Sequence, residues 1–230
     1  MPFFFFDYYY ILFVIPPLIF ATWAQIKVKS TFSRYSSYHN SRGYTAVMVA
    51  RRILDDNGLR QVRIEMTSGS LTDHFDPRSN VIRLSESVYN STSVAAIGVA
   101  AHEVGHAIQY SRNYLPIKIR NAIIPITNIG SALAFPLAIL GIIMSIDFLI
   151  SIGIWLFIAV VFFQLITLPV EFNASSRALS TLKNNAILVG EEYNGAKKVL
   201  TAAALTYVGA LLVAVGNLLR LLALAGRRRD

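Results

Sequence analysis

The sequence predicts an α+β membrane protein with about four transmembrane helices and a small soluble domain that contains a short β-sheet. Hydrophobic residues make up 54% of the 230 residues, and they are gathered in long runs instead of being spread evenly. Such runs are typical of membrane spans. Between the first and second runs the composition becomes mixed and charged, with helix-like and strand-like patterns in turn.

The first apolar run, residues 1–26, is expected to be a retained membrane span. Asp7 is its only charged residue, and the run is long enough to cross a hydrocarbon core of about 30 Å. It lacks the basic start and the small-residue cleavage site of a signal peptide. Pro16 and Pro17 are expected to kink the span.

Residues 27–122 are expected to form the main soluble domain. Residues 44–57 have apolar positions at helical spacing and end at Asn57-Gly58, which is a typical helix stop. A second helix, rich in small residues, is predicted at 91–110. Alternating patterns predict short strands at residues 61–66, 71–75 and 81–84.

The apolar stretch at residues 123–168 is interrupted by Asp147 alone, which predicts a transmembrane hairpin. Pro169 is expected to end the second span of this hairpin. A second polar segment follows at residues 169–199 and is expected to complete the soluble part. Residues 200–230 are expected to form the last membrane helix and a basic tail.

Lysine and arginine residues indicate the orientation of the chain in the membrane. Thirteen of them lie from Lys27 to Arg120, and four more lie in the second polar segment. The positive-inside rule therefore predicts a multi-pass protein of the plasma membrane with both polar segments in the cytoplasm. With four spans, the arginines of residues 227–229 end on the opposite side, so the side on which they lie stays open.

The net charge of +8 is explained by basic flanks of membrane spans. Nucleic-acid binding is not expected, because the sequence has no basic stripe interleaved with aromatic residues. Cysteine is absent, which excludes disulfides and thiolate ligands. Any metal site must therefore be built from histidine and carboxylate side chains.

His102-Glu103-Val104-Gly105-His106 is the strongest chemical signal in the chain. Side chains four residues apart lie on one face of a helix, so both imidazoles can reach one metal ion. Glu103 is placed to accept a proton from a metal-activated water molecule. The motif therefore predicts a hydrolytic site with one zinc ion per chain.

A third protein ligand is expected, because catalytic zinc typically binds three side chains and a water molecule. His39, His74 and the downstream acidic residues are available. Glu171 is the best candidate, because it lies at the cytoplasmic end of the third span, on the same side as the motif helix. A carboxylate after Pro169 is equally typical of a solvated helix start, so the residues alone leave this ligand open.

Several segments together resemble the YugP-type neutral zinc metallopeptidases of membranes. These segments are Gly43-Tyr44-Thr45-Ala46, Leu71 to Arg78 (LTDHFDPR), Leu84-Ser85, and His102 to Gln109 (HEVGHAIQ). The segment Glu171-x-x-Ala174-Ser175 is similar to the Glu-x-x-Ala-Asp segment of HtpX-type and CAAX-prenyl membrane proteases, which follows their histidine motif after two spans. The resemblance covers nearly the whole chain.

This resemblance implies a membrane zinc endopeptidase with a cytoplasmic zincin-like domain of the thermolysin (gluzincin) kind. His102, His106 and Glu171 would be the zinc ligands, and Glu103 would be the catalytic base. Ser175 stands where the related proteases have Asp. In that place it would orient a histidine ligand only as a neutral hydrogen-bond acceptor.

Analogy with thermolysin-like folds also gives a role to the strand before the motif helix. This strand would be an edge strand that binds an extended peptide substrate by β-addition, through Val81, Ile82, Arg83 and Leu84. An ordinary buried strand would have a similar sequence. A group that stabilises the oxyanion is needed as well; the candidates are His74, Arg177 and Tyr193.

Three functions compete on the sequence alone. The first is a zinc endopeptidase that acts on membrane or membrane-proximal proteins. The second is an intramembrane protease of the site-2 type, but here charged residues flank the motif helix, among them Glu86 and Arg112. The third is a non-enzymatic membrane scaffold with a structural metal site, which would have no use for Glu103. The sequence predicts neither the substrate, the oligomeric state nor a regulatory partner.

Overall fold

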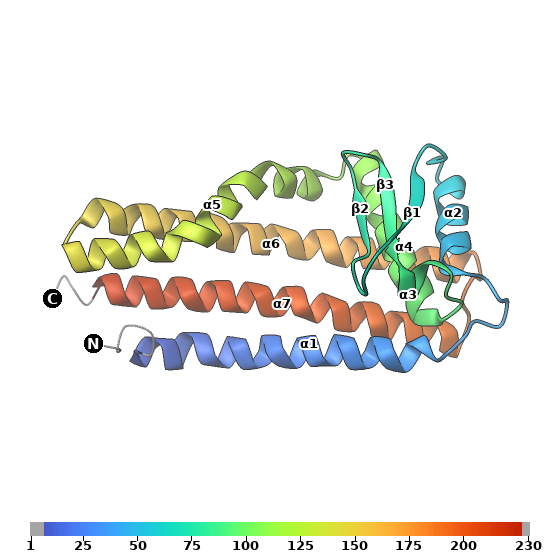
Figure 1. Cartoon of the computed structure of the whole chain (residues 1–230), viewed down its shortest axis with the longest axis horizontal. Helices are drawn as coiled ribbons and strands as arrows, with labels where there is room; N and C mark the ends of the chain where they lie inside the picture. The colour runs from blue at the N-terminus through green and yellow to red at the C-terminus, as the bar shows by residue number, and fades with distance from the viewer. Residues whose placement is uncertain (1–6, 227–230) are drawn as a thin grey trace. The chain divides into compact units, whose positions relative to one another are not determined.

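The structure is a computed structural model that describes residues 7–226. It is mostly helical and contains a three-stranded sheet (Figure 1). Four helices of the described chain are long and apolar enough to cross a membrane, judged by length and composition. The predicted class is confirmed at this level. Parts of the expected first span (residues 1–6) and of the basic tail (residues 227–230) lie outside the described residues.

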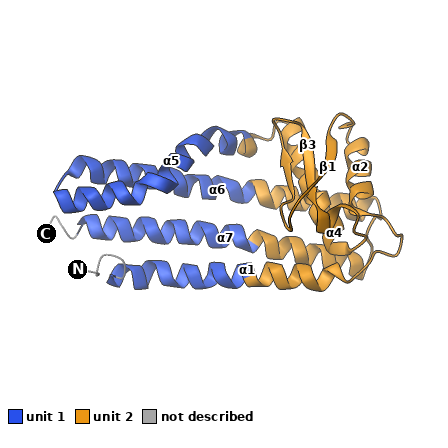
Figure 2. Cartoon of the chain, in the orientation of Figure 1, with its two compact units in different colours: residues 1–25, 118–169, 205–230 blue, residues 26–117, 170–204 orange. Residues whose placement is uncertain are grey.

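The chain divides into two compact units (Figure 2). Unit 1 comprises residues 1–25, 118–169 and 205–230, and unit 2 comprises residues 26–117 and 170–204. The sheet and the H-E-x-x-H motif both belong to unit 2, whereas most of the apolar runs belong to unit 1.

Unit 2 is built around α4 (Val94–Ser111), the helix that carries the H-E-x-x-H motif. The Ser93 hydroxyl caps its start, because it accepts a hydrogen bond from the Ala96 N–H at 3.2 Å. Helix α2 (Ala46–Asp56) packs against α4, and Thr45 caps it in the same way. The buried face of α2 confirms the helix predicted for residues 44–57.

The sheet of unit 2 has the strand order β1-β3-β2. Strand β1 pairs with β3 in parallel, and β2 pairs with β3 in antiparallel register. The bounds are Arg63–Thr67 for β1, His74–Asp76 for β2 and Val81–Ser85 for β3. The three strands overlap the three predicted ones, and the short helix α3 (Glu86–Tyr89) leads from the sheet to α4.

Strand β3 lies in the middle of the sheet, so the prediction of an edge strand there is wrong. The residues concerned are Val81, Ile82, Arg83 and Leu84. Both sides of β3 already share ladder hydrogen bonds with a neighbouring strand, and no backbone edge is left for an added peptide. All of these side chains except that of Arg83 are buried.

Asp76 holds the turn between β2 and β3. Its carboxylate accepts hydrogen bonds from the Ser79 hydroxyl at 2.6 Å, the Arg78 backbone N–H at 2.9 Å and the Arg83 guanidinium at 3.1 Å. These bonds, first of all that from Ser79, favour the charged form and hold the pKa of Asp76 well below its usual range. The conspicuous Asp-Pro-Arg sequence therefore fixes a loop.

The apolar runs form four long helices. A π-helical turn, η1 (Tyr10–Val14), leads into α1 (Ile15–Ser36), and the others are α5 (Leu115–Met144), α6 (Asp147–Asn184) and α7 (Glu191–Gly226). Ser145 and Ile146 alone separate α5 from α6, as expected for a tight helical hairpin. The prolines at positions 16 and 17 follow the π-helical turn directly, at the start of α1.

Helix α6 continues through Pro169, so this proline does not end the helix that carries the second span. A proline inside a helix removes one backbone hydrogen bond, but the turns on both sides can continue the helix. As a result, the apolar stretch before Pro169 and the polar stretch up to Asn184 form one helix.

Asp7 and Arg220 form an ion pair in unit 1, in which the arginine is buried and the Asp7 side chain is 19% exposed. Asp7 Oδ2 lies 2.7 Å from Arg220 Nη2 and 3.0 Å from Arg220 Nε, and Arg220 is 4% exposed. The ring centroids of Tyr10 and Phe135 each lie 5.0 Å from the guanidinium carbon. The pair accounts for an arginine within the last apolar run, because an intramembrane charge needs a partner.

Replacing Arg220 by Leu is expected to destabilise the protein by about 3 kcal/mol, because the Asp7 carboxylate is then left without its partner in a poorly solvated place. The double variant Asp7→Leu/Arg220→Leu is expected to recover most of this loss. Thermal unfolding in detergent, followed by helical circular dichroism, measures both. A single variant as stable as the parent would show that the pair contributes nothing.

Candidate metal centre

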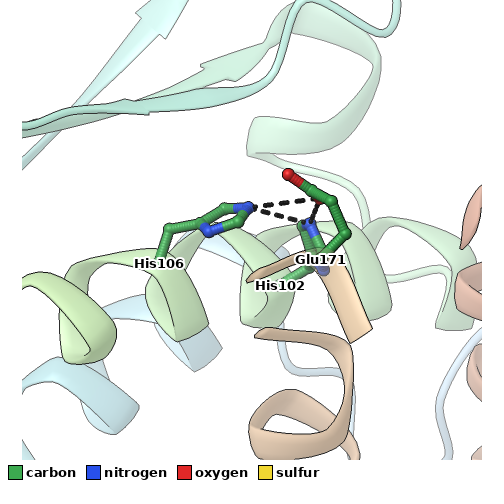
Figure 3. Close-up of side chains that lie close together, drawn as sticks. All are labelled: His102, His106 and Glu171. Carbon is green, nitrogen blue, oxygen red and sulfur yellow. Dashed lines mark hydrogen bonds and ion pairs between the residues drawn. The ribbon is translucent and has the colours of Figure 1, made fainter. Parts of the chain in front are cut away.

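The side chains of His102, His106 and Glu171 converge on one point in unit 2 (Figure 3). The two Nε2 atoms are 3.1 Å apart, and Glu171 Oε2 lies 3.3 Å from His102 Nε2 and 3.5 Å from His106 Nε2. Tetrahedral zinc with bonds of about 2.0–2.1 Å keeps its ligand atoms about 3.3 Å apart. The three atoms therefore form a triangle of the size that a zinc ion requires.

Two helices supply these three side chains. His102 and His106 lie one helical turn apart on α4, and Glu171 lies on α6. Ala174 and Ala178 lie on the same face of α6 as Glu171, three and seven positions further on, and both are buried. Small side chains on this face let α6 come close to α4.

Gly105 is required for this close approach. A Cβ atom at position 105 would lie 2.6 Å from the carbonyl oxygen of Ala174, which is too close for any real contact. Because the obstacle is backbone, no side-chain rotation can relieve it. Gly105 therefore allows Glu171 to reach the two histidines.

The second ring nitrogen of each histidine also has a polar neighbour. His106 Nδ1 lies 3.0 Å from Gln109 Oε1, and His102 Nδ1 lies 3.1 Å from Ser175 Oγ. Histidines that bind metals typically donate their other N–H in this way, which fixes the ring and leaves the opposite nitrogen free as a ligand. Ser175 therefore contacts His102, which lies one helical turn before His106.

The centre is largely shielded from solvent and contains the carboxylates of two glutamates. The side chains of His102, His106 and Glu171 are 14%, 12% and 5% exposed, and Glu103 is buried beside them on α4. Burial alone would lower the pKa of His106, but the carboxylates of Glu171 and Glu103 raise it above its usual value. The donor set therefore favours a bound cation.

His39 and His74 do not belong to this cluster. His39 Nδ1 lies 2.8 Å from the Thr92 hydroxyl, close to the start of α4. His74 lies exposed on β2, where its Nδ1 donates to the Thr72 carbonyl at 2.8 Å. Of the ligand sets left open by the sequence, the one with Glu171 is the set whose atoms converge.

The proposed oxyanion stabilisers have other contacts. Arg177 Nε donates to Asn173 Oδ1 at 2.7 Å. The Tyr193 ring lies beneath Lys183, whose Nζ is 6.0 Å from the ring centroid. These contacts tie both side chains to neighbouring residues, and the oxyanion role of His74, Arg177 or Tyr193 stays a prediction.

Sequence reasoning missed two residues of the centre, Gln109 and Asn173. Gln109 is fully buried, and its Nε2 donates to Asn173 Oδ1 at 3.0 Å. A signal for Gln109 was present, because it follows His106 by three positions and so lies on the same face of the helix. Asn173 carries no comparable signal, since its partner lies on another helix.

Comparisons with known proteins identify a family and a relative of the chain. A family model described as "putative neutral zinc metallopeptidase" matches residues 10–226. The chain is 49% identical over 221 residues to "Putative membrane protease YugP" of Bacillus subtilis (strain 168), an alignment that covers 96% of this chain and 98% of that protein. No solved structure matches the chain.

Replacing Gly105 by Ala is expected to lower the affinity for zinc at least tenfold, because the added methyl group pushes the two helices apart and moves Glu171. Gly98→Ala is the matched control on the same helix, since its Cβ would meet Ala196 at an ordinary 3.4 Å. Zinc competition with a chromophoric chelator measures both. If Gly105→Ala binds zinc as tightly as Gly98→Ala, the close approach is not required.

Proposed function

The chain belongs to the neutral zinc metallopeptidase family, and on this premise we propose that it is a membrane-anchored zinc endopeptidase. The observation that carries the proposal is the triangle of His102 Nε2, His106 Nε2 and Glu171 Oε2, whose sides of 3.1, 3.3 and 3.5 Å suit tetrahedral zinc. Each chain binds one ion. The substrates are peptide bonds of membrane or membrane-proximal proteins.

A zinc ion held by these ligands supplies Lewis-acid activation of a water molecule and of the scissile carbonyl group. Glu103 is the base: its carboxylate takes a proton from the attacking water and returns it to the leaving amine nitrogen. Hydroxide is thereby added to the carbonyl carbon and hydrogen to the amine, while the C–N bond breaks. His102 and His106 would hold the ion through their Nε2 atoms.

The position of Glu171 along α6 supports a membrane-proximal substrate. The apolar stretch of this helix ends at Leu168, three residues before Glu171. At 1.5 Å per residue, the ligand lies about 4.5 Å further along the helix axis. A peptide bond that reaches the zinc ion would therefore be close to the point where the substrate leaves the membrane.

We propose that the extended substrate pairs with β2. In the order β1-β3-β2, one side of β2 has no partner strand within the described sheet, so its backbone groups are available for β-addition. Phe75 of β2 packs edge-on against Tyr110 of α4, with ring centroids 6.1 Å apart, so this strand lies beside the motif helix. His74 is then the first residue of the binding strand.

Unit 2 is proposed to be the catalytic domain and to face the cytoplasm. This assignment gathers the segments that the sequence expected to be catalytic, residues 27–122 and 169–199, with small differences at their ends. The excess of lysine and arginine in these segments favours the cytoplasmic side of the plasma membrane. A zincin-like (thermolysin-like) fold of this domain is part of the proposal.

Two other functions are less well supported. An intramembrane protease of the site-2 type would carry the motif within a span, but α4 is not among the four helices of the described chain that suit a bilayer. A scaffold with a structural metal site would need neither a buried Glu103 nor a ligand set of only three side chains.

Glu103→Gln is expected to keep one zinc ion per chain but to reduce cleavage of an unfolded casein-like substrate by about 10²–10⁴-fold, because the amide cannot accept the proton. Metal analysis and cleavage of the purified protein in detergent measure the two properties. Phenanthroline should abolish the activity of the parent, and added zinc should restore it.

Glu86→Gln is the matched control for this substitution, because Glu86 is exposed on α3 and outside the centre. It should leave metal content and cleavage unchanged. Equal cleavage by the parent and Glu103→Gln would favour the scaffold. A folded parent protein that contains no zinc would refute the ligand set as a whole.

Cleavage should depend on the distance between the scissile bond and the membrane. We expect a substrate with one transmembrane anchor to be cut fastest when its cleavable segment follows the anchor within about five residues, and progressively more slowly as a flexible linker separates the two. Proteoliposomes with substrates of graded linker length measure this. A rate independent of linker length would indicate that the substrate is not membrane-proximal.

A further inference from the structure

We infer that Gln109 is a positioning residue that prepares two metal ligands at once, His106 on its own helix and Glu171 on α6. This inference rests on the zinc site proposed above. Gln109 is 0% exposed, so an amide with unmatched hydrogen bonds would be costly there. Its polar atoms are instead used on both helices.

The hydrogen bonds of Gln109 fix the orientation of its amide. Nε2 donates to the carbonyl oxygen of Val170 at 2.7 Å and to Asn173 Oδ1 at 3.0 Å. The Val170 carbonyl can only accept, and Asn173 Oδ1 also accepts from Arg177 Nε at 2.7 Å. The NH₂ group of Gln109 must therefore face α6, which leaves Oε1 facing His106.

This orientation determines the tautomer of His106. Gln109 Oε1 has no hydrogen to donate, so the contact of 3.0 Å requires the proton on His106 Nδ1. The lone pair is then on Nε2, the atom that faces His102 and Glu171. Ser175 differs, because a hydroxyl can either donate or accept. The tautomer of His106 is therefore fixed by its neighbour, whereas that of His102 is not.

The same amide fixes the turn of α6 that carries the third ligand. Val170 and Asn173 lie on either side of Glu171 in the sequence, and both are bound by one NH₂ group. Rotation or sliding of α6 would break both bonds. Gln109 therefore links the orientation of the His106 ring to the position of the Glu171 carboxylate along the axis of α6. Arg177 extends this chain of hydrogen bonds through its bond to Asn173.

The test is zinc affinity, measured by competition with a chelator in the full-length protein in detergent. Gln109→Met keeps the size of the side chain but loses all three hydrogen bonds, and we expect it to bind zinc 10–100-fold more weakly. In Gln109→Glu the carboxylate can still accept from His106 Nδ1–H but cannot donate to α6. We expect its affinity to lie between those of Gln109→Met and the parent.

Two controls separate positioning from mere stability. Asn40 is a buried amide in unit 2 that donates to the Tyr44 and Thr92 carbonyls at 2.8 and 2.6 Å, away from the centre. Asn40→Leu should lower the melting temperature without changing zinc affinity. Ser175→Ala should weaken zinc binding less than Gln109→Met. The visible spectrum of bound Co²⁺, which reports ligand geometry, should change in Gln109→Met and not in Asn40→Leu.

Zinc affinity of Gln109→Met within twofold of the parent would overturn the inference, and so would an equal loss in Asn40→Leu. If Gln109→Met does not fold, Gln109→Glu decides, because parental affinity and an unchanged Co²⁺ spectrum would then refute a role on α6. A parent that binds no zinc would refute the proposed site itself, an outcome distinct from failure of the Gln109 variants alone.

Discussion

The candidate metal centre depends on one close contact between two helices, in which Gly105 of α4 meets the backbone of Ala174 of α6. The histidines are local to one helix, and their spacing needs nothing beyond helical geometry. Glu171 comes from another helix, and its carboxylate can approach both Nε2 atoms only if the two backbones are nearly in contact. Three features allow or stabilise this contact: the small alanines after Glu171, the missing Cβ of Gly105, and the Gln109 amide that bonds to α6.

Features that depend on local pattern were predictable from the sequence. The helix of residues 44–57, the helix with the H-E-x-x-H motif, the strand segments and the apolar runs all follow from periodicity and capping, and the structure contains each of them. The spacing alone predicts the roles of His102, Glu103 and His106, and the structure brings the two histidines together with Glu171. Glu171 required the resemblance to a family, because on residues alone it could equally have been a solvated helix start.

Features that depend on pairing between distant segments were not predictable. Strand β3 lies in the middle because it pairs in parallel with β1, although β2 lies between these two strands in the sequence. No local pattern encodes this pairing. A proline usually breaks a helix, which predicts a stop at Pro169, but the rest of α6 outweighs the cost of one lost hydrogen bond. The bonds of Gln109 to Val170 and Asn173 are likewise contacts between helices.

The continuity of α6 through Pro169 links the candidate metal centre to the helix segment that is proposed to lie in the lipid bilayer. The apolar stretch of this helix adjusts to the hydrocarbon core by tilting or by local thinning of the lipid. Glu171 lies on the same helix, with no loop between it and that stretch. If Glu171 is a ligand of the metal, a change of lipid that tilts the span also moves this ligand, and acyl-chain length then acts on the coordination sphere.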